Sequence, residues 1–193
     1  MLLALTACAA ARPPPAPSTT RVGGELDRAL VGEWVGVLEY RDYAEPPGST
    51  KRVRLPTWLS ITLDGEQQRW HYTYDDGPGK TVEEVDLVTI GEERFIEQQL
   101  GKPARTYSLS GLANLHGGVG SFELRGEGTD NDQPAEQRVT FSIGRNALDL
   151  VQDTRLTSAG GDAPFVFRHA YHFTRAQRPG LPSQPSAMAA RAR

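Results

Sequence analysis

The chain has only one cysteine among its 193 residues, Cys8, so no disulfide and no thiolate metal site is available to the residues that follow it. It also lacks a concentration of positive charge. The net charge is −3, and the body from 26 to 175 is more acidic than the chain as a whole. Because nucleic-acid surfaces depend on clustered Lys and Arg that face phosphates, we expect no nucleic-acid partner.

Catalytic signatures are missing as well. The sequence contains no Gly-x-Ser-x-Gly nucleophile elbow, no Gly-rich phosphate loop and no His-Glu-x-x-His zinc motif. Nothing in it spaces a nucleophile with a base, so we predict a protein that is not an enzyme and has no catalytic residue, metal or cofactor. The acidic pairs Glu83-Glu84 and Glu92-Glu93 have the pattern of ordinary exposed charges.

Turn-forming residues are plentiful: there are 20 Gly and 14 Pro, and both interrupt helices. Between Leu30 and Arg175 apolar and polar residues alternate with a period of two, which is typical of half-buried strands. The predicted strands cover residues 34–40, 52–63, 68–74, 82–90, 94–99, 105–110, 119–126, 138–143, 147–154 and 165–174. We expect a polar loop at Thr129–Pro134 and a short helical turn at Leu26–Val31.

Many short strands joined by tight turns indicate a meander, and closing a meander into a barrel removes its exposed edges. The sequence therefore predicts an all-β fold, a single antiparallel up-and-down β-barrel of about 8 to 10 strands with disordered termini. The barrel domain is expected over 29–175, with a disordered tail over 176–193.

A Gly-x-Trp motif, Gly32-Glu33-Trp34, opens the first predicted strand. With the strand count, it resembles the lipocalin-like, or calycin, group of barrels. In that group the tryptophan closes the barrel floor under an arginine of the last strand, a cation–π contact worth about 0.5–2 kcal/mol. The resemblance implies that Gly32, Trp34 and Arg175 close the barrel, with Arg168 as the alternative arginine. The chain departs from secreted lipocalins in having no disulfide cysteines and no clear helix near its end.

Aromatic and histidine residues on two predicted strands are the candidates for ligand contacts. On the last strand, residues 165, 167, 169, 171 and 173 are predicted to share one face. Interior side chains of a barrel of this size either fill it or surround one small ligand, and the sequence leaves both readings open. The candidate ligand-binding residues are Trp70, His71, Tyr72, Phe167, His169 and Tyr171.

Some polar residues also lie on amphipathic strands. If they point inward, they need partners such as water or an anionic head group; if not, they form the solvent face. These residues are Arg69, His71, Arg105 and Arg125.

Two groups of residues have side chains that could act as metal ligands. His71 and His169 would bind a metal or haem only if their strands brought them together. Asp130, Asn131 and Asp132 crowd oxygen ligands that calcium could use, but the downstream Gly and Glu of a known calcium loop are lacking. Surface or hydrogen-bonded histidines and a solvated turn are the favoured interpretations, so no metal is predicted.

The start of the chain resembles a bacterial lipoprotein signal. Leu5-Thr6-Ala7-Cys8 matches the lipobox, in which the cysteine is acylated and becomes the first residue of the mature protein. The basic n-region is missing and the apolar stretch is short. The resemblance implies a signal remnant over 1–8, lipidation of Cys8, a Pro-rich tether over 9–28 and, with Ala9 after the cysteine, the outer membrane facing the periplasm.

Together these features predict a membrane-anchored envelope lipoprotein whose lipocalin-like barrel binds a small hydrophobic or amphipathic ligand, such as a lipid or fatty acid. The alternative is a filled barrel that serves as a structural or assembly partner of another envelope protein. An enclosed empty volume would favour the first hypothesis, and an exposed apolar patch or open strand edge would favour the second.

Overall fold

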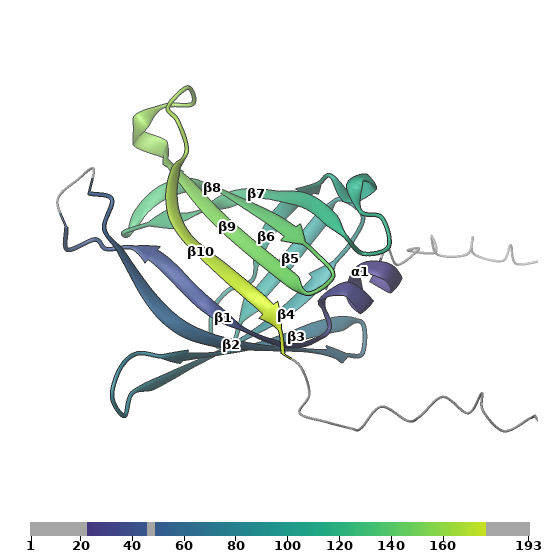
Figure 1. Ribbon diagram of the computed structural model, residues 1–193. Helices are drawn as coiled ribbons and strands as arrows, with labels where there is room; N and C mark the ends of the chain where they lie inside the picture. The colour runs from purple at the N-terminus through teal and green to yellow at the C-terminus, as the bar shows by residue number, and fades with distance from the viewer. Residues whose placement is uncertain (1–22, 46–48, 177–193) are drawn as a thin grey trace, which may run out of the picture.

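The computed structural model of the protein describes residues 23–45 and 49–176. In this part of the chain, ten antiparallel strands form one closed barrel with the order β1-β10-β9-β8-β7-β6-β5-β4-β3-β2, and a helix covers one end (Figure 1). Each strand pairs with its neighbours in the sequence, and β1 closes the barrel against β10. The prediction of an all-β up-and-down barrel is confirmed.

The elements follow in a simple order. Helix α1 is Gly23–Leu30, and two single 3-10 turns are Leu112–Asn114 and Thr157–Ala159. The strands are β1 Gly32–Arg41, β2 Arg52–Asp64, β3 Gln67–Asp75, β4 Thr81–Ile90, β5 Arg94–Gln99, β6 Arg105–Ser110, β7 Gly120–Asp130, β8 Gln133–Ile143, β9 Ala147–Leu156 and β10 Val166–Arg175.

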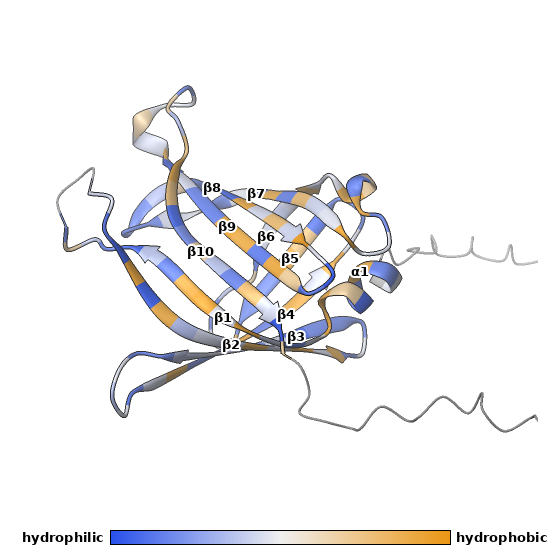
Figure 2. Ribbon diagram, viewed as in Figure 1, coloured by the Kyte–Doolittle hydropathy of each residue, from blue (hydrophilic) through white to orange (hydrophobic). Residues whose placement is uncertain are grey.

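The two-residue rhythm decides which side chains enter the barrel, because successive side chains of a strand point to opposite faces. In β3, Gln68, Trp70, Tyr72 and Tyr74 are buried, while the residues between them are exposed or half-buried. The same alternation is visible as bands of opposite hydropathy along the strands (Figure 2).

Helix α1 lies against the end of the barrel at which β1 begins and β10 ends (Figure 1). Its buried residues Leu26 and Leu30 belong to the same core as Trp34, Leu59 and Leu148. The helix is longer than the predicted turn. Most of α1 lies before residue 29, where the barrel domain was predicted to begin, and its apolar face packs against this end of the barrel.

Two local predictions were wrong. The stretch 129–134 is not a polar loop: β7 and β8 pair as far as Asp130 and Gln133, and only Asn131 and Asp132 form the turn. Their φ angles of 50° and 62° are left-handed, a conformation that Asn and Asp tolerate and that two-residue hairpins require.

The second correction concerns β10, where the predicted common face of residues 165 to 173 is broken. The pairing of β10 with β9 shifts between Phe167 and His169, which marks a β-bulge. Phe165 comes just before the first residue of β10. Its ring packs against the guanidinium groups of Arg138 and Arg155, whose central carbons lie 4.5 and 4.7 Å from the ring centroid.

Cys8, the predicted signal remnant, most of the tether and the tail after Ala176 lie outside the described residues. Within the described ranges, the structure contains no helix with the length and apolar character needed to cross a membrane.

Candidate functional site

The end of the barrel covered by α1 is closed by the stacked side chains of Trp34 and Arg175. Trp34 is buried and its indole N–H donates to the Leu30 carbonyl at 2.8 Å. The Arg175 guanidinium lies 4.1 Å from the indole centroid and donates to the carbonyls of Val31, at 2.8 Å, and Ala29. The cation thus satisfies carbonyls at the C-terminal end of α1, where a positive charge is favourable.

Gly32 is part of this closure because of its backbone. Its φ is +138°, and a Cβ there would lie 2.6 Å from an Arg175 guanidinium nitrogen. The structure therefore brings together Gly32, Trp34 and Arg175, the three residues predicted to close the barrel.

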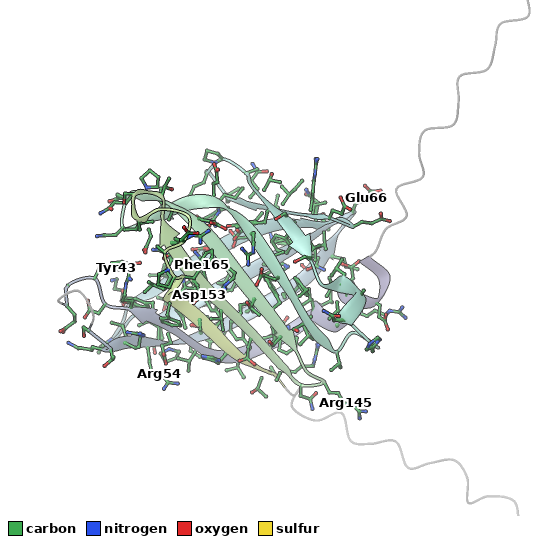
Figure 3. The ribbon with its side chains drawn as sticks, turned by 90° about the horizontal axis from the view of Figure 1, so that it is seen from above. Tyr43, Arg54, Glu66, Arg145, Asp153 and Phe165 are labelled. Atoms are coloured by element: carbon green, nitrogen blue, oxygen red, sulfur yellow. The ribbon has the colours of Figure 1, made fainter. Side chains whose placement is uncertain are left out.

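Arg168, the alternative arginine, lies at the opposite end. It donates to Asp130, which is buried and also accepts from Arg41 at 2.9 Å and from the Thr154 hydroxyl at 2.7 Å. Tyr43 donates to the same carboxylate. Tyr43 and Arg145 mark the two ends of the barrel in Figure 3.

Two arginines therefore already pair with the Asp130 carboxylate, so it is not available to bind an external cation. Burial raises its pKa, but the hydrogen bonds from Tyr43 and Thr154 and the charges of Arg41 and Arg168 outweigh burial and lower it. Among the described residues, no group of three or more His, Cys, Asp or Glu has an arrangement that would hold a metal ion.

Between the closed end and the Asp130 network, the barrel encloses a cavity of about 310 Å³. The cavity approaches solvent at the end that lies far from α1. Lys102 and Arg168 form part of its wall there. Its wall comprises Trp70, Tyr72, Glu84, Asp86, Val88, Phe95, Glu97, Lys102, Arg105, Tyr107, Leu124, Thr129, Gln137, Val139, Phe141, Leu150, Gln152, Arg168, His169 and Tyr171.

The inner part of this cavity is aromatic. Trp70 meets the rings of Phe95 and Phe141 edge-on, with centroids 6.3 and 6.2 Å apart. The Trp70 N–H donates to Gln68 at 2.7 Å, and Gln68 in turn donates to Asp27 of α1 at 2.6 Å. These hydrogen bonds fix the floor rigidly to the helix, so the apolar surface above it is preformed.

The wall nearer the mouth is charged. Glu84 and Asp86 come from β4, Glu97 from β5, and Arg105 and Tyr107 from β6. Arg105 pairs with Glu97 at 3.1 Å. Lys102 and Arg168 also belong to the wall, and the Lys102 charge acts on Glu84, so charged groups of both signs face the cavity, where an unpaired charge is costly.

Asp86 is the most unusual member of this wall. Its side chain is only 2% exposed, and its Oδ1 has no hydrogen-bond partner among the described residues. Burial and the charges of Glu97 and Glu84 raise the pKa of Asp86 to about 8. Burial also raises the pKa of Glu84. A protonated Asp86 at neutral pH offers both a donor and an acceptor to the cavity.

The candidate ligand-binding residues divide into two groups. Trp70, Tyr72, His169 and Tyr171 line the cavity. Burial, with the charges of Arg168 and Arg105, lowers the pKa of His169 to about 3, so its imidazole is neutral at physiological pH.

His71 and Phe167, by contrast, are not among the residues that line the cavity. His71 alternates with Trp70 and Tyr72, so it lies on the outer face, where its Nε2 is 3.6 Å from Glu83. Phe167 lies at the β10 bulge, with the Arg52 guanidinium 4.7 Å from its ring centroid. His71 and His169 consequently do not form a pair.

The carboxylates of the wall were missed by sequence reasoning. The sequence pattern predicts an exposed charge at Glu84, yet Glu84 lines the cavity with Asp86. The signal was their phase: Glu84 and Asp86 alternate with Val85 and share a face with Val88. Of the four polar residues considered as inward-facing, Arg105 alone is in the cavity wall.

Comparisons with known proteins inform the fold. No family model matches this chain, and no curated protein matches it. Among solved structures, it is similar to the S-type phycobiliprotein lyase CPES from Guillardia theta, with a TM-score of 0.50 and 11% identity over 80% of this chain and 92% of that chain. This likeness is consistent with a calycin-like barrel, and at such low identity it shows the fold alone.

Proposed function

We propose that this protein is a binding protein that holds one small amphipathic molecule inside its barrel. The observation that carries the proposal is the unfilled volume of about 310 Å³ between Trp70 and the charged wall. A cavity of this size, lined by aromatic groups and a few convergent polar groups, is typical of small-molecule sites. The floor is fixed by hydrogen bonds to α1, so little ordering is required when a ligand enters.

We further propose that the role is binding and not catalysis. The sequence carries no catalytic signature. The neutral His169 and the carboxyl groups of the wall serve to orient a ligand. The likeness to a lyase supports a barrel that accommodates a molecule; it does not carry that enzyme's chemistry to this chain.

A neutral fluorescent probe tests the binding proposal. N-phenyl-1-naphthylamine brightens in an apolar environment, and we expect it to bind with one site per chain. Val139→Trp places a larger side chain in the cavity wall and should weaken binding about tenfold or more, because cores do not accept added volume without strain. Val35→Trp, at an exposed position on β1, is the matched control and should bind as the wild type does. Equal binding by both variants would contradict an internal site.

We also propose that Cys8 anchors the protein in the bacterial envelope, at the outer membrane facing the periplasm. The support is the lipobox-like Leu5-Thr6-Ala7-Cys8, since acyl chains on its cysteine would hold the protein stably at a membrane. In a bacterial host fed an alkyne-bearing fatty acid, the wild type should become labelled and enter the membrane fraction. Cys8→Ala should do neither; a labelled Cys8→Ala protein would refute the assignment.

One observation favours a second role as a partner of another envelope protein. Val35 and Trp58 are opposite one another in the β1–β2 register, and both are exposed on the outer wall, at 41% and 46%. Exposed apolar pairs of this kind contribute to protein interfaces. A photo-crosslinker at position 58 should then give a single discrete adduct in the envelope, while one at the exposed Arg69 should not.

A further inference from the structure

The polar groups around the cavity identify the chemistry of the ligand's head. Arg105 is already paired with Glu97, at 3.1 Å. Arg168 is paired with Asp130. A carboxylate or phosphate ligand would have to displace one of these carboxylates to reach either arginine. The two arginines of the cavity wall therefore have little to offer an anion, and the third cation of the wall, Lys102, acts on Glu84 and not on Asp86.

Among the hydrogen-bond acceptors of the wall, in contrast to the paired arginines, one has no partner in the described part of the chain. Asp86 is buried and lines the cavity, and its Oδ1 has no hydrogen-bond partner among the described residues. Glu84 and Glu97 lie close enough to Asp86 to raise its pKa by their charge, and Glu97 raises it further through a side-chain hydrogen bond, so it is the Oδ1 atom of Asp86 that is left for a ligand. An unsatisfied buried oxygen is costly, and a ligand that donates a hydrogen bond to it removes that cost.

On this basis we propose that the ligand presents a protonated amine, or a similar cationic nitrogen, to Asp86 between Glu84 and Glu97, with its apolar body on Trp70 and Phe141. The proposal rests on the barrel being a binding site, as proposed above. No arrangement in the described residues suits a metal ion, so an organic cation is the class that the wall selects.

Proton release gives this proposal a distinctive signature. The charged and titratable groups that face Asp86 are Glu84 on its own strand, Glu97 on β5, Arg105 and Tyr107 on β6, and the tyrosines of β3 and β10, which are Tyr72, Tyr74 and Tyr171. Lys102 acts on Glu84 and lies nearer the mouth. With the pKa of Asp86 at about 8, the empty site holds a proton at pH 7, and an arriving cation should displace it.

Three probes with the same eight-carbon chain separate the possibilities: octylammonium, 1-octanol and octanoate, titrated calorimetrically into the full chain at pH 7. We expect octylammonium to bind about tenfold or more tightly than octanoate, as a hydrogen bond to a charged group predicts. Repeating the titration in buffers of different ionisation enthalpy should reveal proton release with octylammonium and none with 1-octanol.

Asp86→Asn should abolish the preference for octylammonium over octanoate and the proton release, and Glu92→Gln, at an exposed turn position, should change neither. If octanoate binds as tightly as octylammonium, or if Asp86→Asn retains the preference, the cationic head group is refuted while the binding role stands. If none of the three probes binds, both proposals fail.

Discussion

Replacing Asp86 by Asn should make the protein more stable at neutral and alkaline pH, because the change removes an ionisable group from the barrel interior. Burial first, then Glu97 and Glu84, raises the pKa of this carboxyl from 3.8 to about 8. Between these two values the folded wild type holds a proton that the unfolded chain has released. Its free energy of unfolding must therefore fall as pH rises from about 4 to about 8.

The size of the effect follows from the same linkage. One extra proton bound by the folded state gives a slope of at most ~1.4 kcal/mol per pH unit. Allowing for relaxation of the site, we expect about 1 kcal/mol per unit, so that Asp86→Asn exceeds the wild type by about 2–4 kcal/mol at pH 8 and matches it near pH 4. Above pH 8 the difference should stay constant.

Urea unfolding followed by tryptophan fluorescence, at intervals from pH 4.5 to 8.5, measures this difference. Glu92→Gln removes an exposed carboxylate in the same conservative way and should follow the wild type at every pH. A variant Asp86→Asn that is as pH-dependent as the wild type, or less stable at pH 8, would show that the Asp86 carboxylate is satisfied in the folded protein. That result would refute the reasoning about the charged wall.

Two further substitutions test the barrel itself. Arg175→Ala removes the cation–π contact with Trp34 and two hydrogen bonds, one to Ala29 of α1 and one to Val31 just after it, so we expect a loss of about 2–4 kcal/mol in the free energy of unfolding. Arg145→Ala, exposed at the same end, should change it by less than about 0.5 kcal/mol, and equal effects of the two would contradict the closure. Gly36→Ala places a Cβ 1.9 Å from the His172 carbonyl oxygen across the β1–β10 seam, so thermal denaturation should show a loss of about 3 kcal/mol or more. Gly161→Ala, where nothing lies within 4 Å, should be near neutral; a neutral Gly36→Ala would argue that the seam is not formed as described.

The strands could be predicted because each depends on local alternation. Trp70, Tyr72 and Tyr74 share a face in any strand, whatever its neighbours. The closure depends on one pairing, Trp34 with Arg175, which the resemblance to calycin barrels suggested and which the β1–β10 register brings about.

What failed depended on irregularity or on tertiary context. The β10 bulge removes Phe167 from the expected face, and a bulge leaves no mark in the alternation of residue types. Likewise, the half-buried Glu84 differs locally from the exposed Glu83 only in sharing a face with Asp86 and Val88, and that phase does not by itself say which face turns inward. The three carboxylates of the wall, Glu84, Asp86 and Glu97, come together only because β4, β5 and β6 curve around the same cavity.

The most direct test of the account is a crystal structure of the protein with N-phenyl-1-naphthylamine bound. The account predicts density for one probe molecule inside the barrel, in contact with Trp70 and Phe141, with Trp34 and Arg175 unchanged at the closed end. A barrel interior filled by its own side chains, with Tyr171 and His169 packed onto Trp70 and the probe only on the outer surface, would contradict it.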